Sequence, residues 1–224
     1  MSKKTALALA AFVAIALPTT AFGQIGVGAR VGTLGLGGDV SFGIGSRLGI
    51  RAGLGVVPGE IETTLDDIDY TLNPPSNIWN IGVDVYPFGG GFRLSAGFVN
   101  RKSFELTAVR TGQTEIGDNT YNGTITIDGS LGNERETAPY AAIGFGKIHN
   151  SGFGLFVDLG AAQMGDADIR LTGTCVVNGT QQCPSQNGQT FQQTLDEEAA
   201  QAEEDAGGYL KWHPILQIGL KFGF

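Results

Sequence analysis

The sequence lacks an apolar run long enough to cross a membrane as a helix. Such a helix needs about 20 apolar residues, and the longest run, from about Thr5 to Leu17, is shorter. Histidine and cysteine are also scarce, with two of each, and 14 basic residues stand against 22 acidic ones for a formal net charge of −8. The acidic balance disfavours nucleic-acid binding, and two histidines and two cysteines offer few ligands for a zinc-type metal centre. We therefore expect no cofactor and no nucleic-acid partner.

Residues 1–23 have the pattern of a secretory signal peptide. Lys3 and Lys4 precede the apolar run, and Pro18 and a small-residue triplet that begins at Ala21 follow it. This order of charged, apolar and small residues is typical of an export signal, and it predicts cleavage before Gln24. No cysteine stands at that point to carry a lipid anchor. Residues 24–224 are then expected to form one exported domain.

The two cysteines, Cys175 and Cys183, lie close together in a polar stretch. Oxidation is favoured in an exported chain, so the pair predicts a local disulfide. A metal site is disfavoured, because no histidine lies nearby to complete a set of four ligands.

Apolar residues alternate with polar or small ones, which is the period of a β-strand, through much of the chain. The predicted strands are residues 24–34, 40–44, 48–54, 79–86, 92–99, 140–146, 153–160 and 209–224. A sheet edge that faced lipid would leave backbone groups unpaired, so membrane strands must close into a barrel. The pattern predicts an all-β fold, a closed antiparallel eight-stranded transmembrane β-barrel.

A soluble β-sandwich would alternate in the same way, and further features favour the membrane barrel. The non-apolar face consists mainly of Gly, Ser and Ala, which suits the narrow interior of eight strands. The links are short at residues 46, 89–91 and 149–152, and longer after Val57, Val109 and Leu171. Short periplasmic turns and long external loops produce this asymmetry.

Aromatic residues gather near the ends of the predicted strands. Trp79 and Trp212 lie at the proposed outer rim, and Phe88 and Phe92 at the inner one. Such positions predict the two aromatic girdles of a membrane barrel.

The C-terminal segment WHPILQIGLKFGF resembles the terminal strand of bacterial outer-membrane barrels. In that class this strand is the signal for the barrel assembly machinery. The resemblance assigns this role to Leu216, Ile218, Leu220, Phe222 and Phe224.

Eight strands in a chain of this size resemble the OmpA transmembrane domain, OmpX and OmpW. The resemblance implies a porin-like protein of the Gram-negative cell envelope, located in the outer membrane in contact with its lipids and lipopolysaccharide. No peptidoglycan-binding domain follows Phe224, unlike in OmpA, so we expect no tethering role.

The alternation also predicts a set of charged side chains that face the barrel interior. The set consists of Arg30, Arg47, Arg51, Arg93, Arg101, Asp84, Glu105 and Asp158. Buried charges must be paired, so we expect a salt-bridge network that closes the lumen. The alternative is a narrow ion pathway, as in an OmpW-like channel or transporter for small solutes.

Catalysis has little support in the sequence. Outer-membrane enzymes that modify lipids need a histidine with a serine and a carboxylate. His149 lies in a predicted turn, and His213 has no evident serine partner on neighbouring strands. We expect no enzymatic activity, and a lipid-modifying enzyme is the least favoured alternative.

Two predicted loops are acidic, residues 59–70 and 192–206. The second is rich in alanine and precedes two glycines, which predicts a short acidic helix in the last long loop. These loops are expected to form a solvated surface or to bind divalent cations that bridge to lipopolysaccharide, or a cationic partner. The function predicted from the sequence is structural or surface-interacting, in a monomer.

Overall fold

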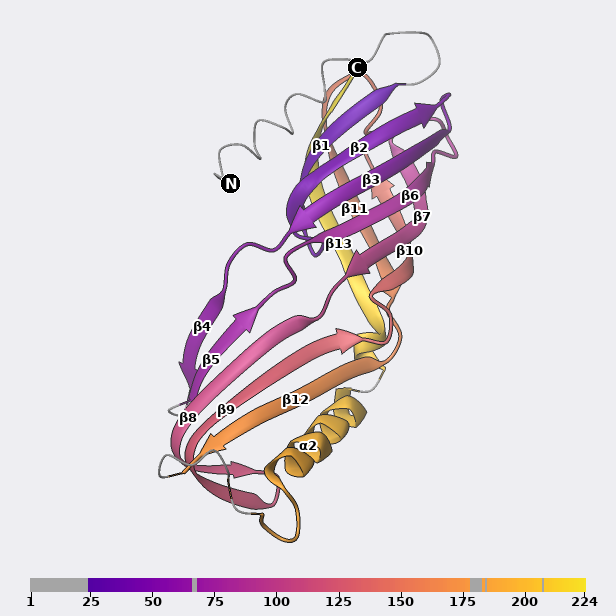
Figure 1. The fold of residues 1–224 in the computed structure, drawn as a ribbon. Helices are drawn as coiled ribbons and strands as arrows, with labels where there is room; N and C mark the ends of the chain where they lie inside the picture. The colour runs from indigo at the N-terminus through magenta and orange to yellow at the C-terminus, as the bar shows by residue number, and fades with distance from the viewer. Residues whose placement is uncertain (1–23, 66–67, 178–182, 184, 207) are drawn as a thin grey trace.

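The structure, a computed structural model, describes residues 24–65, 68–177, 183, 185–206 and 208–224. The predicted signal peptide, residues 1–23, lies outside the described residues. A closed barrel forms one part of the molecule, and a five-stranded sheet with a helix beside it projects from one end of the barrel (Figure 1). Within the described ranges, no helix is long and apolar enough to cross a membrane.

The barrel consists of eight antiparallel strands. They are β1 (Ile25–Gly32), β2 (Leu36–Ile44), β3 (Leu48–Val56), β6 (Ile78–Val85), β7 (Phe92–Arg101), β10 (Thr137–Phe145), β11 (Gly152–Gln163) and β13 (Trp212–Gly223). The last strand closes the barrel, because β13 pairs with β1 on one side and with β11 on the other. All eight are the segments that the two-residue period predicts, so the predicted antiparallel barrel is confirmed.

Burial alternates along the barrel strands, most regularly in β6, β10 and β13. The apolar residues lie on the outside, where Leu155, Ile218 and Phe222 are 63%, 53% and 47% exposed. Polar and small residues make up most of the inward face, with a few apolar ones such as Val99 and Ile215. An exposed apolar belt of this extent, around a polar interior, is typical of a lipid-facing barrel wall.

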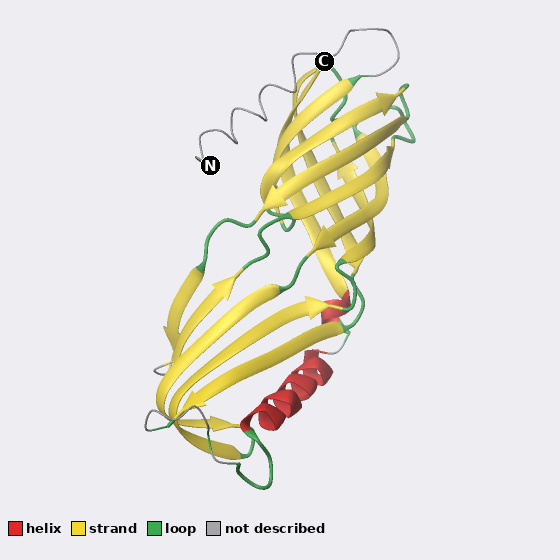
Figure 2. Cartoon of the chain, in the orientation of Figure 1, coloured by secondary structure: helices red, strands yellow, loops and turns green. Residues whose placement is uncertain are grey.

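The two ends of the barrel differ (Figure 2). One end holds the start of β1, the end of β13 and the three short turns after β2, β6 and β10; we call it the turn end. The connections after β3, β7 and β11 leave the other end, which we call the sheet end.

The long connections form a second sheet, which the sequence did not predict. Its strands are β4 (Ile61–Leu65), β5 (Ile68–Asn73), β8 (Phe104–Ile116), β9 (Asn119–Asn133) and β12 (Ala167–Val176), in the order β12-β9-β8-β5-β4. Placing the starts of long loops after Val109 and Leu171 was wrong, because these residues lie inside β8 and β12. The frequent threonines and glycines of these strands hide the apolar period that the barrel strands show.

Helix α2 (Phe191–Ala206) packs against this sheet and confirms the predicted acidic helix. Its first turn is capped by Thr190, whose Oγ1 accepts a hydrogen bond from the backbone N–H of Gln193, while the Gln193 side chain accepts one from the N–H of Thr190. This is a capping box. Phe191 and Leu195 are buried in a cluster with Ile125 and Cys175. The predicted disulfide between Cys175 and Cys183 is confirmed and links β12 to the segment that leads into α2. A short 3-10 helix, η2 (Tyr209–Lys211), then leads into β13.

Candidate functional site in the barrel lumen

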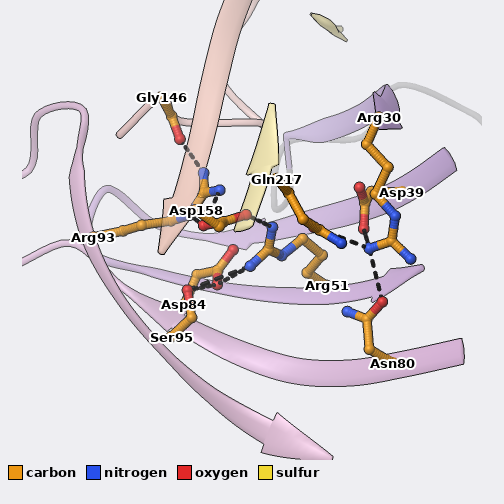
Figure 3. A network of polar contacts seen from close by, with 10 residues as sticks. All are labelled: Arg30, Asp39, Arg51, Asn80, Asp84, Arg93, Ser95, Gly146, Asp158 and Gln217. Carbon is orange, nitrogen blue, oxygen red and sulfur yellow. Dashed lines mark hydrogen bonds and ion pairs between the residues drawn. The ribbon is translucent and has the colours of Figure 1, made fainter. Parts of the chain in front are cut away.

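Charged side chains from six strands meet inside the barrel (Figure 3). Each occupies an inward position of its strand, and each has a relative exposure of at most 2%. The six are Arg30, Asp39, Arg51, Asp84, Arg93 and Asp158. Three positive charges therefore stand against three negative ones. We call them the lumen network.

Asp158 lies at the centre of the network and bridges two arginines. Its Oδ2 accepts a hydrogen bond from Arg51 Nη1 at 2.7 Å, and its Oδ1 accepts one from Arg93 Nη2 at 2.6 Å. Arg93 also donates to the backbone carbonyl of Gly146 at the turn end. Charge-assisted bonds of this length are the strong kind, so the three strands β3, β7 and β11 are tied together across the lumen.

Arg51 lies between two carboxylates. Its Nη2 is 3.3 Å from Asp84 Oδ1, and Ser95 Oγ donates to the same oxygen at 2.6 Å. Asp84 thus gains a neutral donor besides the arginine. The contacts extend the network to β6.

A second ion pair joins β1 and β2. Arg30 Nη1 is 2.9 Å from Asp39 Oδ1 and donates to Asn80 Oδ1 at 2.8 Å. Gln217 Oε1 on β13 lies 3.4 Å from the same nitrogen. Buried charges are costly unless paired, and here each arginine of the network has at least one carboxylate partner.

Towards the sheet end, an apolar cluster fills the barrel above the network. Its members are almost fully buried inward or rim residues from most of the barrel strands. The cluster comprises Leu34, Ile78, Val99, Ala138, Tyr140, Ala142, Ala162, Met164 and Ile215. Apolar packing of this kind excludes water from the mouth of the barrel.

Towards the turn end, the turn of residues 147–150 folds into the barrel. Ile148 and His149 have no exposed surface. The His149 ring stands edge-on to Tyr86, with centroids 5.1 Å apart, and it fits against Gly43, where a Cβ would overlap the ring. We call residues 147–150 the inward turn.

Two lysines hold the inward turn in place. Lys221 Nζ, on β13, donates to the carbonyl oxygens of Asn150 at 2.6 Å and of Gly152 at 3.0 Å. Lys147 Nζ donates to the carbonyl oxygen of Ser46 in the neighbouring turn at 2.6 Å. The turn is therefore fixed inside the barrel at this end.

Burial lowers the pKa of His149 to about 4, and the positive charge of Lys147 adds to the shift. Neither imidazole nitrogen has a hydrogen-bond partner among the described residues. The ring is therefore neutral at pH 7 and acts as an apolar filler.

The structure brings five of the predicted lumen charges together, namely Arg30, Arg51, Arg93, Asp84 and Asp158. It adds Asp39, Asn80, Ser95 and Gln217, which sequence analysis missed. Asp39 lies outside the predicted strand, because the alternation predicts a link at residues 35–38 and a strand that begins only at Val40. The available signal was its spacing of two from Ser41, which places both on one face.

Three of the predicted lumen charges lie elsewhere. Arg47 is exposed in the turn between β2 and β3, and Glu105 is exposed on β8 of the second sheet. Arg101 ends β7 at the sheet end, where its Nη2 donates to Asn133 Oδ1 at 2.7 Å and its guanidinium lies over the Phe104 ring. For Arg47 and Glu105 the cause is that the alternation was extended past the points where the barrel strands end, whereas Arg101 is the last residue of β7 and lies at the rim, away from the lumen network.

The predicted interface aromatics lie at the two ends of the barrel. Trp79 and Trp212 lie at the starts of β6 and β13, at the sheet end, and are 39% and 54% exposed. Phe88, 82% exposed, lies 5.9 Å from Phe92 at the turn end, measured between ring centroids. Their role at the membrane interface stays a prediction.

The predicted assembly-signal residues share the outer surface of β13 and its terminus, and all are exposed. They are Leu216, Ile218, Leu220, Phe222 and Phe224. Their recognition by an assembly machinery stays a prediction.

No group of three or more His, Cys, Asp or Glu side chains is arranged to hold a metal in the part of the chain that the structure describes. A pocket of about 460 Å³ lies outside the barrel, between the C-terminal part of α2 and the start of β12. Asp166, Glu203 and Glu204 line it together with Lys211, whose Nζ is 2.6 Å from Asp166. Cation binding at the acidic segments stays a prediction.

No protein-family model matches the chain, and no curated protein does. Among solved structures, the chain is similar to Acinetobacter baumannii CarO, with 21% identity and a TM-score of 0.54 over 89% of this chain and 97% of that one. It is also similar to Acinetobacter baumannii CarO2, with 23% identity and a TM-score of 0.58 over 92% of this chain and all of that one. At this level of identity the likeness concerns the fold. The chain has the fold of the small eight-stranded outer-membrane β-barrels.

Proposed function

We propose that the protein is a non-catalytic barrel of the bacterial outer membrane, whose lumen is closed and whose five-stranded sheet acts at the cell surface. The lumen network is the observation that carries this proposal. Three arginines and three aspartates pair across the interior, and an eight-stranded barrel has room for little more than its own side chains. The role is then structural or surface-interacting.

The lumen is blocked at three levels, which supports a closed barrel. The apolar cluster lies towards the sheet end, the lumen network lies below it, and the inward turn lies towards the turn end. An ion would have to displace all three. The breaking of buried ion pairs alone is costly.

Conductance in planar bilayers tests the closed lumen. The refolded chain should give no steady single-channel current, and Asp158→Ala, which removes the central carboxylate, serves as a comparison. Discrete openings in the unmodified protein would reject the closed lumen.

A second candidate is a narrow channel for small solutes, of the OmpW kind. One observation favours it: several buried polar atoms of the lumen have no partner among the described residues, including Arg30 Nε, Asp39 Oδ2 and Tyr140 Oη. Buried polar groups of this kind are usually satisfied by ordered water, and a hydrated interior is a first requirement of a conducting path. The same conductance measurement separates the two candidates.

A lipid-modifying enzyme gains no support from the two histidines. His213 Nε2 is buried without a hydrogen-bond partner among the described residues, as are both nitrogens of His149. A histidine that acts as a general base takes a proton at one nitrogen from a hydrogen-bonded nucleophile, and no such nucleophile is bonded to these nitrogens among the described residues.

A further inference from the structure

The five-stranded sheet has two edge strands, β12 and β4, and they differ in what lies beside them. The β12 edge is covered by α2: Glu203 Oε1 accepts a hydrogen bond from the backbone N–H of Ile169 at 2.7 Å, and Gln192 Nε2 donates to the carbonyl oxygen of Leu171 at 2.8 Å. The helix thus satisfies backbone groups that face away from the sheet. An edge capped in this way does not accept a further strand.

The β4 edge is open. Strand β4 pairs with β5 on one side, and it ends the strand order on the other. Figure 1 shows it along the outer margin of the sheet, with no described element beside it. Backbone groups along such an edge form a template for the addition of a strand.

The two faces of the sheet at this edge have opposite character. Cross-strand partners form one apolar row that runs from β4 to the strand under α2. The row is Ile61, Leu72, Leu106, Gly129 and Leu171. Leu171 packs against the buried cluster beneath α2, whereas Ile61 at the far end is 58% exposed. The apolar face therefore continues past the helix to the open edge.

The neighbouring row, on the opposite face, is polar throughout. It consists of Glu62, Thr71, Thr107, Asp128 and Thr172. Glu62 and Asp69 are both exposed at or beside the edge, and no basic residue occurs in residues 59–70. An added strand would meet Ile61 on one face and a negative charge on the other.

From this we propose that the β4 edge binds an extended polypeptide segment with alternating basic and apolar side chains. The apolar side chains of the segment would lie beside Ile61, and its basic side chains would lie beside Glu62 and Asp69. Directly opposed unlike charges and apolar pairs stabilise adjacent strands, while like charges destabilise them. A second copy of β4 is thus a poor occupant, because it would bring acidic residues against acidic residues.

The inference names the partner class for the proposed surface-interaction role and rests on that role. Its test uses the refolded full chain in a non-ionic detergent. The probe is a fluorescent peptide of about eight residues, a usual strand length, in which lysine and valine alternate. One control peptide replaces two central valines with proline, which cannot complete a strand ladder, and another replaces lysine with glutamate.

Fluorescence anisotropy should show saturable binding of the lysine peptide and no binding of either control peptide. Glu62→Lys should raise the Kd by roughly tenfold, because an attraction at the edge becomes a repulsion. Glu115→Lys is the matched control, since Glu115 is exposed on β8 of the same sheet but away from the β4 edge. It should change the Kd by less than about twofold. Hydrogen exchange should show new protection in residues 61–65.

Several results would overturn the proposal. If Glu62→Lys and Glu115→Lys raised the Kd equally, or if the proline peptide bound, the peptide would be held by charge attraction without adding a strand. Protection of α2 instead of β4 would place the binding site elsewhere. Absence of binding would mean that the acidic residues only prevent strand addition at this edge. A dimer that forms through the β4 edge and prevents peptide binding would identify a second copy of this chain as the occupant of that edge. None of these results bears on conductance, so a failure here is distinguishable from a failure of the closed barrel.

Discussion

Asp158 and Asp166 form ion pairs of the same length in very different surroundings. Each has a carboxylate oxygen 2.6 Å from a cationic nitrogen, of Arg93 and Lys211 respectively. The first pair is at most 2% exposed at the side chains, while Asp166 is 69% exposed and Lys211 47%. Water screens the second pair, so its contribution to stability is expected to be small.

Asp158→Ala should therefore destabilise the barrel by about 3–5 kcal/mol, since it leaves the buried Arg93 without a carboxylate partner and Arg51 with Asp84 alone. Asp166→Ala should cost less than about 1 kcal/mol. Urea unfolding in detergent, followed by heat-modifiable gel migration, measures both. A similar small loss in the two variants would show that water reaches the lumen charges, which would favour the channel.

His149 links the stability of the turn end to pH. Its folded-state pKa of about 4 lies below the usual value of 6.5, so the unfolded chain binds the proton more readily than the folded one. The stabilising effect of the neutral ring is complete above about pH 6.5 and declines as the pH falls towards 4. Besides Lys147, the charged groups Arg93, Lys221 and Asp84 act on this ring, and the first two disfavour its protonation.

We expect unfolding stability to fall by up to about 3 kcal/mol between pH 6.5 and 4 through this residue alone. His149→Gln, which cannot titrate, should remove that part of the pH dependence. Urea unfolding of both proteins at several pH values gives the difference, in which the carboxylates common to both cancel. Parallel pH profiles would mean that the inward turn leaves the barrel, or is hydrated, before the ring is protonated.

Single residues show where sequence analysis works and where it fails. Strand parity places Arg30, Arg51 and Asp158 inward correctly, because the period of two is strict inside a barrel strand. It fails for Arg47 and Glu105, because parity says nothing about where a strand ends. Which carboxylate each arginine contacts depends on how strands that are distant in the sequence are staggered against one another. That stagger is set when the barrel closes, so parity within a strand does not predict it.

At the scale of elements, α2 is held on the sheet mainly by a few apolar side chains. Leu195 is 1% exposed and lies in the cluster with Phe191 and Ile125. Leu195→Ala should cost about 2–5 kcal/mol of local stability and release the helix from β12. Gln201→Ala is the matched control, because Gln201 is an exposed residue of the same helix.

Hydrogen exchange of α2 measures that release, and heat-modifiable migration reports the barrel separately. Fast exchange in α2 with an unchanged barrel is the expected result for Leu195→Ala. Loss of the barrel in that variant would show instead that the sheet and the barrel fold as one unit.

The elements also explain why the second sheet escaped sequence analysis. In a membrane barrel, every second residue of a strand faces lipid and is apolar, so the two-residue period is easily recognised in the sequence. In β8 and β9 the face away from α2 is solvated and rich in threonine, and Thr107 bonds to Asp128 across the strands. The α2 face contains Gly112, Gly123 and Gly129. Such segments have the composition of loops, although their pairing is regular.

At the scale of the whole molecule, the even number of barrel strands places the start of β1 and the end of β13 at the same end of the barrel. The same side holds the three short turns, whereas the acidic helix and the five-stranded sheet lie on the other. Bacterial barrels have short periplasmic turns and long extracellular loops. The turn end is thus expected in the periplasm and the sheet at the cell surface.

Single-cysteine labelling of intact cells tests this orientation. Glu115→Cys places a thiol on the exposed side of β8, and Ser46→Cys places one in the exposed turn after β2; the native cysteines are joined in a disulfide. A maleimide that cannot cross the outer membrane should label Glu115→Cys in intact cells, but Ser46→Cys only after permeabilisation. The opposite pattern would put the sheet in the periplasm, and it would move the proposed binding edge of β4 there as well. If Glu115→Cys and Ser46→Cys were both labelled only after permeabilisation, the sheet would be covered by another component of the envelope. The lysine-valine peptide would then be expected to bind the isolated protein but not intact cells.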